Sequence, residues 1–174
     1  MLGEGKQDKA EAMDRIVEIK SSESIGGALM LFTQTSRLVS KYIDAYFYHK
    51  NGLSFIKFLV LKTLASRNGV MTPSQIAEWT QTELHNITAL VGRLKKEGSV
   101  VTKRSDIDRR SINIFLTDKG RMVIDQSMPV AEEIIAQLMS SVTEADAIKL
   151  SRVLKVLRDN AYDGLEKMSS DFRK

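Results

Sequence analysis

The sequence contains no cysteine and only two histidines, His49 and His85. The absence of cysteine excludes disulfides, thiolate zinc sites, thiol catalysis and cysteine-based redox sensing. Two histidines are too few for a histidine-rich metal site. The chain also lacks a glycine-rich phosphate loop, paired histidines at metal-ligand spacing and a nucleophile motif. These absences argue against a small enzyme, and no cofactor is expected.

Long apolar segments are missing as well. No run approaches the roughly 18 apolar residues that a membrane span requires, and residues 1–9 lack the apolar core of a signal peptide. We therefore expect a cytoplasmic protein without a membrane partner. The 174 residues are 43% hydrophobic and 28% charged, which is typical of a soluble globular protein with one domain or two small ones.

The positive charge of the chain is concentrated in one segment. The net charge is +4, and residues 84–110 hold seven basic and three acidic residues, so the whole surplus lies there. A concentrated basic patch is what neutralisation of nucleic-acid phosphates requires. Charge runs are also common on solvated faces that bind nothing. The charge favours nucleic-acid binding without deciding it.

Residues 100–116 predict a β-hairpin with a charged tip. The second strand, residues 111–116, has the alternation of a half-buried strand. Its apolar positions are Ile112, Ile114 and Leu116. The connecting residues 105–110 are too polar to pack and include the adjacent arginines Arg109 and Arg110. Such a tip can insert a guanidinium into a narrow, negatively charged groove, and a solvated turn is the alternative interpretation.

Helices are predicted on both sides of this hairpin. The ranges with helical periodicity or capping signals are about 7–20, 25–48, 54–67, 73–79, 83–97, 118–139 and 144–168. Helix 54–67 is apolar most of the way round and should be central. Thr72 and Gln75 predict a capping box, and Thr82 is a candidate N-cap for helix 83–97. Pro129 predicts a kink or an interruption.

The apolar faces of these helices indicate how they pack. Helix 83–97 places five apolar residues on one face: Leu84, Ile87, Leu90, Val91 and Leu94. The last helix carries an apolar seam with spacings of three and four over residues 147–168. One small domain cannot cover that seam, so a homodimer is expected.

Two short helices, a tight turn and a hairpin, in that order, predict a winged helix-turn-helix. The expected fold class is mainly α with a small β-hairpin: a DNA-binding lobe plus a helical dimerisation lobe. The predicted divisions are an N-terminal extension with a short helix (1–22), an N-terminal dimerisation helix (23–53), the DNA-binding domain (54–120) and C-terminal dimerisation helices (121–174).

A known signature appears at the hairpin. Asp108-x-Arg110, followed by Leu116-Thr117 and Gly120, resembles the wing signature of the MarR (multiple antibiotic resistance) regulators. Residues 72–77 resemble the first helix of the family's helix-turn-helix, and residues 86–98 resemble its recognition helix. The resemblance covers roughly residues 25–168. Two departures are Ser99, where the family prefers an apolar residue, and Ala89, where many members have arginine or proline.

The resemblance implies roles for residues of the helix-turn-helix. Helix 83–97 would lie in a major groove, with Asn86 reading adenine and with His85 and Thr88 as secondary base contacts. The alternative for Asn86 is a solvent-facing residue near the helix start. The side chains expected at phosphates or in the surrounding positive field are Thr72, Ser74, Arg93, Lys103 and Arg104.

The resemblance also implies roles for the wing tip. Arg110 would enter the minor groove, and Asp108 would hold it by a charge-assisted hydrogen bond. Arg109 would then meet a phosphate.

Regulators of this family commonly bind a small aromatic or phenolic ligand between the dimer helices and the DNA-binding lobe. The candidate lining residues are Tyr42, Tyr46, His49, Phe55, Phe58 and Trp79. Aromatic side chains at helical spacing are more often core.

The expected function is a homodimeric, sequence-specific transcription regulator on double-stranded DNA with a two-fold operator, a repressor relieved by a small effector. The alternative is a constitutive architectural or accessory DNA-binding protein without ligand control. A pure interaction module is disfavoured by the local charge and the wing signature.

Overall fold

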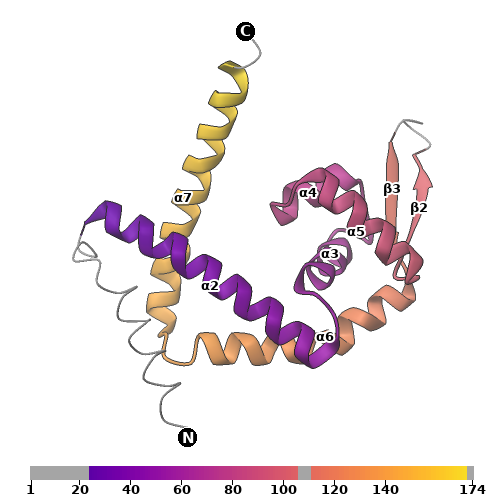
Figure 1. Ribbon diagram of the computed structural model, residues 1–174, viewed down its shortest axis with the longest axis horizontal. Coiled ribbons are helices and arrows are strands. Elements are labelled where there is room, and N and C mark those ends of the chain that lie inside the picture. Colours follow the sequence, from indigo (N-terminus) through magenta and orange to yellow (C-terminus); the bar gives the residue numbers. More distant parts are fainter. Residues whose placement is uncertain (1–23, 106–110, 172–174) are drawn as a thin grey trace, which may run out of the picture. The chain divides into compact units, whose positions relative to one another are not determined.

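The structure is a computed structural model that describes residues 24–105 and 111–171 (Figure 1). The chain separates into two compact units, the first ending at Ala131 and the second beginning at Glu132. The predicted helix over residues 7–20 lies outside the described ranges. The division into an extension, dimerisation helices and a DNA-binding domain stays a prediction.

Apart from one short strand, β1, the elements follow the order that the sequence predicts. They are α2 (Ile25–Asn51), α3 (Phe55–Ser66), β1 (Val70–Met71), α4 (Pro73–Thr80), α5 (Leu84–Lys96), β2 (Val100–Arg104), β3 (Ile112–Leu116), α6 (Asp118–Leu138) and α7 (Glu144–Asp171). Helices dominate, and the hairpin strands β2 and β3 follow α5, as the expected fold class requires. Among the described residues, no helix is both long and apolar enough to cross a membrane.

The sheet has a strand that the sequence did not predict. The strand order is β1-β3-β2, so β3 is central and pairs antiparallel with both neighbours. Phe115 of β3 pairs with Val70 of β1 on one side and with Val101 of β2 on the other. Because β1 has only two residues, it is too short to show the alternation by which strands are recognised. It joins the segment before α4 to the wing.

Left-handed backbone positions follow the first two described helices. Gly52 has φ 62° and its amide donates to the carbonyl oxygen of Tyr48 at 2.9 Å, which closes α2. After α3, Asn68 has φ 59° and Gly69 has φ 79°. The amide of Gly69 donates to the carbonyl oxygen of Leu64 at 2.8 Å. These caps satisfy carbonyl groups that the helix ends leave free.

The core of the first unit is built around α3, which confirms that this helix is central. Val60, Leu61 and Leu64 are fully buried. Phe47, near the end of α2, is also fully buried, and its ring centroid lies 4.9 Å from Phe58 and 5.2 Å from Phe55. Burying such a side chain contributes roughly 1.5–3 kcal/mol. The C-terminal part of α2 is therefore anchored in the winged-helix core.

Pro129 does not interrupt α6. The helix runs continuously from Asp118 to Leu138 with Pro129 inside it. Of the two expected outcomes, the interruption is therefore wrong, and the kink stays a prediction. A proline inside a helix removes one backbone hydrogen bond without necessarily ending the helix.

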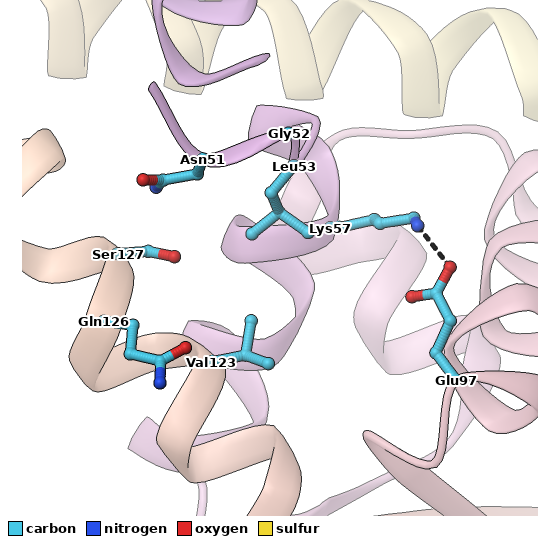
Figure 2. Close-up of a pocket in the computed structure, with 8 residues that line it drawn as sticks. All are labelled: Asn51, Gly52, Leu53, Lys57, Glu97, Val123, Gln126 and Ser127. Atoms are coloured by element: carbon cyan, nitrogen blue, oxygen red, sulfur yellow. Dashed lines mark hydrogen bonds and ion pairs between the residues drawn. The ribbon is translucent and has the colours of Figure 1, made fainter. Parts of the chain in front are cut away.

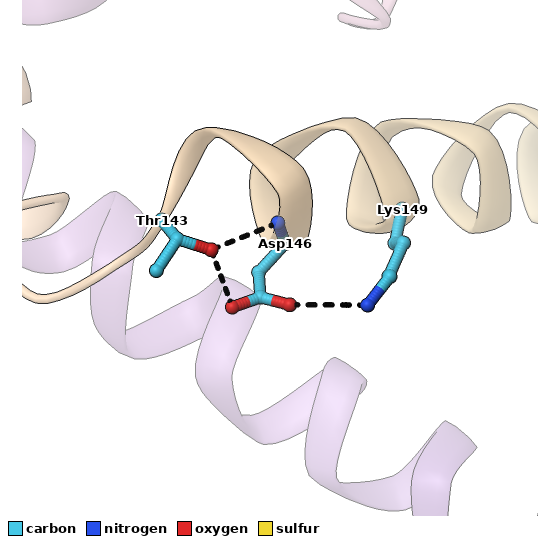
Figure 3. Close-up of polar contacts among 3 residues, drawn as sticks. All are labelled: Thr143, Asp146 and Lys149. Carbon is cyan, nitrogen blue, oxygen red and sulfur yellow. Dashed lines mark hydrogen bonds and ion pairs between the residues drawn. The ribbon is translucent and has the colours of Figure 1, made fainter.

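In the second unit, Thr143 caps the start of α7 (Figure 3). The amide of Asp146 donates to the Thr143 hydroxyl oxygen at 3.2 Å, and that hydroxyl donates to Asp146 Oδ2 at 2.7 Å. Lys149 Nζ lies 3.5 Å from the other carboxylate oxygen of Asp146. Thus the first turn of α7 is fixed by a side-chain cap and an acidic residue at its positive end.

The predicted seam of α7 is not covered within the described chain. No residue of α7 is buried. The more exposed members of the seam are Leu150, Leu165 and Met168, at 49%, 57% and 53%. The homodimer that would cover them stays a prediction.

Candidate nucleic-acid interface

The start of α4 is fixed by the predicted capping box. The amide of Gln75 donates to the Thr72 hydroxyl oxygen at 3.3 Å, and the Thr72 amide donates to Gln75 Oε1 at 2.9 Å. Pro73 stands at the first helical position, where its missing N–H costs nothing. Ser74 is exposed beside the half-buried Thr72. This rigid, positively polarised helix start is suited to a phosphate.

The turn between α4 and α5 differs in one detail from the expectation. Glu83, and not Thr82, occupies the N-cap of α5, and its side chain makes no capping hydrogen bond. The Thr82 hydroxyl donates instead to the carbonyl oxygen of Thr80 at 3.2 Å. Gln81 adopts φ 52° and so reverses the chain between the helices. Thr82 is therefore used inside the turn, and its prediction as the N-cap is wrong.

The inner face of α5 is apolar and holds the helix to the core. Ile87, Leu90, Val91 and Leu94 are buried, as predicted. Leu84 is 48% exposed, so its assignment to the buried face is wrong. It is the first residue of the helix, and burial begins one turn later at Ile87.

The outer face of α5 is exposed and changes character along the helix. His85, Asn86 and Thr88 lie in its first turns, and the structure brings these three predicted base contacts together. The Thr88 hydroxyl donates to the carbonyl oxygen of Leu84 at 2.9 Å. The last turn is basic, with Arg93 followed by two lysines. The helix thus presents polar groups at one end and cations at the other, the arrangement of a groove-binding helix.

The end of α5 is tied to the wing and to α6. Gly98 has φ 76°, and the amide of Ser99 donates to the carbonyl oxygen of Leu94 at 2.9 Å. The Thr117 hydroxyl donates to the carbonyl oxygen of Gly98 at 2.8 Å and accepts from the amide of Gly120 at 3.0 Å. One threonine therefore caps α6 and holds the end of α5.

The described part of the wing is basic on its exposed side. Lys103 and Arg104 of β2 are exposed, and Lys103 Nζ lies 5.6 Å from the centre of the Phe115 ring. Of the three apolar positions predicted to face inward on β3, Ile114 is fully buried, whereas Ile112 is 48% exposed. Leu116 is half-buried. The wing-tip residues Asp108, Arg109 and Arg110 lie outside the described residues.

A model of the MarR family matches residues 51–111. The HTH-type transcriptional repressor IacR of Pseudomonas putida is 30% identical to this chain over 129 residues, which cover 74% of this chain and 72% of IacR. This chain belongs to the MarR family. The family consists of DNA-binding transcription regulators and not of enzymes, which confirms the resemblance and the regulator class drawn from the sequence.

Solved structures of transcriptional regulators share the fold. An organohalide-sensing transcriptional regulator, crystallised with 2,4-dichlorophenol, is 25% identical with a TM-score of 0.66, and the match covers 76% of this chain and 78% of that one. Sco3205, a MarR-family regulator from Streptomyces coelicolor solved in complex with DNA, is 18% identical with a TM-score of 0.71, covering 76% and 84%. The expected winged helix-turn-helix is confirmed.

The aromatic residues predicted as a ligand pocket fall into separate groups in this MarR-family chain. The Tyr42 and Tyr46 rings lie 5.6 Å apart on α2. Phe55 and Phe58 belong to the core cluster around Phe47 described above, and His49 is exposed. Trp79 is 56% exposed, and the guanidinium of Arg67 lies 4.0 Å from its ring centre. The ligand assignment of these six residues stays a prediction.

A cavity of about 340 Å³ lies elsewhere in the first unit (Figure 2). Its lining residues are Asn51, Gly52, Leu53, Lys57, Glu97, Val123, Gln126 and Ser127. The aromatic residues predicted from the sequence are not among them. One edge of the cavity is an ion pair in which Lys57 Nζ of α3 lies 2.5 Å from Glu97 Oε1. Glu97 directly follows α5, so this pair joins the cavity to the recognition helix. The sequence feature that could have indicated this cavity is Lys57, a cation within an otherwise strongly apolar stretch.

Proposed function

We propose that this protein is a homodimeric, sequence-specific transcriptional repressor that binds a two-fold DNA operator and is relieved by a small ligand. The observation that carries the proposal is the outer face of α5. Asn86 and its polar neighbours are exposed in the first turns, and cations follow in the last turn. The inner face of the same helix is fully engaged in the core, so the outer face is free for a partner.

The base contacts proposed for α5 centre on Asn86, whose amide can pair bidentately with adenine. His85 and Thr88 contribute at adjoining positions. The residues that fix the register at phosphates are Thr72, Ser74, Arg93, Lys103 and Arg104. On the wing, Arg110 enters the minor groove, Asp108 orients it and Arg109 meets a phosphate.

Exposed apolar side chains support the homodimer. On α2, Leu29, Met30 and Leu38 are 53%, 56% and 64% exposed. On α7, Val153 and Val156 are 56% and 58% exposed, beside the seam described above. Apolar surface on this scale marks an interaction site in a soluble protein. Light scattering should give twice the 19.5 kDa chain mass, and a single-chain mass at micromolar concentration would contradict the dimer.

The experiment that tests DNA recognition is selection of bound duplexes from a random pool, followed by titration at several salt concentrations. The expected product is a two-fold site with half-sites about 34–36 Å apart, one helical turn. Affinity should fall steeply with salt, because bound phosphates release counterions. Enrichment of no sequence would favour the architectural alternative, and binding without salt dependence would contradict both.

We place the ligand of the proposed relief of repression at the cavity, where the lining suits a small anion. Lys57 supplies the positive group, and its partner Glu97 stands at the end of α5. A ligand oxygen that takes the place of the Glu97 carboxylate would free that end of the recognition helix. Such a ligand alters DNA affinity only if it prefers one arrangement of α5. A similar transcriptional regulator is crystallised with 2,4-dichlorophenol, an ionisable phenol of suitable size.

The ligand proposal is tested with 2,4-dichlorophenol as the probe in operator titrations. In the wild type, the compound should lower operator affinity, and Lys57→Met should abolish this effect because the cation is gone. Glu97→Gln, which keeps the size of the side chain, should weaken operator binding without the compound. Lys62→Met, on the same helix but outside the cavity lining, is the control. An equal response of Lys57→Met and wild type would contradict the proposal.

A further inference from the structure

Ser127 is a buried polar residue on α6 whose hydroxyl has no hydrogen-bond partner among the described residues. The residue is only 3% exposed. A serine or threonine inside a helix commonly donates to the carbonyl oxygen one turn earlier, as Thr33, Thr80 and Thr88 do in this chain. A hydroxyl that is buried without such a bond costs free energy. The fold therefore does not explain why a serine stands at this position.

The Ser127 hydroxyl opens onto the cavity described above. No side-chain nitrogen or oxygen of the described residues is both sealed from solvent and without a partner. The small exposed part of Ser127 must therefore include its hydroxyl oxygen. Ser127 lines the cavity, and its hydroxyl points toward the space beside Leu53 (Figure 2). A polar group that is held in this way is suited to orienting a bound molecule.

The two sides of the cavity differ in their chemistry (Figure 2). One side has the ammonium group of Lys57, whose side chain is 20% exposed. On the other side, the serine hydroxyl is accompanied by the uncharged amides of Asn51 and Gln126. The apolar side chains of Leu53 and Val123 lie between these two sides. The lining therefore presents a cation, an apolar middle and a neutral hydrogen-bonding group in that order.

We propose that the ligand of this cavity carries an anionic group at one end, which meets Lys57, and a neutral hydroxyl group at the other, which bonds to Ser127. This inference rests on the proposed function and names the chemical class of its ligand. A serine hydroxyl can both donate to and accept from such a group. The cavity volume of about 340 Å³ holds one ring with both substituents, since about 150 Å³ already accommodates benzene. 2,4-Dichlorophenol offers the first of the two groups but not the second.

A matched pair of compounds tests the second group. 4-Hydroxybenzoate and 4-methylbenzoate share the ring and the carboxylate, and differ by a hydroxyl in place of a methyl group of similar size. Isothermal titration calorimetry on the full-length protein measures both affinities. The wild type should bind 4-hydroxybenzoate about threefold to tenfold more tightly, the usual net effect of one hydrogen bond. In Ser127→Ala this preference should disappear or reverse. Ser151→Ala, at an exposed serine of α7, is the control and should keep the preference.

Thermal unfolding separates a ligand contact from a merely structural role of Ser127. The melting temperature of Ser127→Ala without ligand should equal or exceed that of the wild type. Alanine is the better helix former, and the change removes a buried hydroxyl that has no partner. Loss of the ligand preference in an equally stable variant would support the contact. A lower melting temperature would mean that the hydroxyl stabilises the fold, and would overturn the assignment.

The outcomes also separate this inference from the proposed function. If the wild type binds both compounds equally, or binds neither, the second polar contact is wrong. Operator recognition and the role of Lys57 are then still decided by the operator titrations with 2,4-dichlorophenol. If the preference depends on Ser127 but 4-hydroxybenzoate leaves operator affinity unchanged, the ligand contact stands and relief of repression through this cavity fails.

Discussion

The carbonyl oxygen of Ser99 lies 2.3 Å from the point where a Cβ would stand on Gly120. The Leu116 Cδ1 atom is 2.6 Å from the same point. Ser99 is buried, and its carbonyl oxygen also accepts from the amide of Thr117 at 3.2 Å. The first turn of α6 is therefore pressed against the chain that leaves the recognition helix. Gly120 is required by this close contact and not by an unusual backbone angle.

Gly120→Ala should destabilise the protein by about 1–3 kcal/mol, the usual cost of forcing an extra methyl into a packed site. Backbone forms the closest contact, so the strain cannot be relieved by a side-chain rotation alone. Urea denaturation gives the change in free energy of unfolding. The control is Gly92→Ala, where space is open. Equal unfolding midpoints for Gly120→Ala and the wild type would show that the contact relaxes without cost.

Thr72→Ala should cost about 0.5–2 kcal/mol of stability, because it removes the hydroxyl half of the capping box. Thr72→Ser keeps the oxygen and should retain most of that stability. Both variants are compared by denaturant titration, and their operator affinities are then measured under conditions where each is fully folded. If alanine and serine variants unfold at the same denaturant concentration, the cap contributes nothing measurable.

Arg110→Ala should weaken operator binding strongly while leaving the dimer intact, because a guanidinium in a narrow minor groove is strongly attracted there. Arg109→Ala should weaken binding to all duplexes alike and reduce the salt slope by about one, as loss of a phosphate contact does. Gel-shift titrations against operators with and without an A-tract opposite the wing distinguish the two roles. If Arg110→Ala binds the operator as tightly as the wild type, the assignment of Arg110 to the minor groove is wrong.

Phe47→Ala should cost about 3–5 kcal/mol, since it empties a fully buried ring site between α2 and α3. Phe47→Leu, which keeps most of the apolar volume, should be clearly less harmful. Circular dichroism during thermal unfolding measures both. A loss below 1 kcal/mol for Phe47→Ala would mean that α2 is not anchored by this residue.

Local signals explain why much of the fold was predictable. The capping box at Thr72, the threonine at Thr143 and the glycines after α2 and α5 act within a few residues of where they stand. Their effects are therefore readable without knowledge of the rest of the chain. The apolar character of α3 likewise forecast its central place, because a helix that is apolar on every side must be covered on every side.

The features that the sequence did not reveal depend on distant partners. β1 forms because Val70 and Met71 pair with residues of β3 more than forty positions later in the chain. A segment of two residues carries no pattern from which this pairing could be predicted. The ion pair of Lys57 with Glu97 spans forty positions and defines a cavity that the aromatic pattern did not indicate. Leu84 was misjudged because helical periodicity gives the direction of a side chain but not where the covering surface ends.

Trp79 gives the protein a built-in optical reporter. It is the only tryptophan in the chain, and it stands on α4, exposed and covered on one face by the guanidinium of Arg67. Emission excited at the red edge of protein absorbance therefore originates from the helix-turn-helix alone. DNA or ligand titrations can be followed through the fluorescence of Trp79, without labels. The long terminal helices contribute no tryptophan emission to that signal.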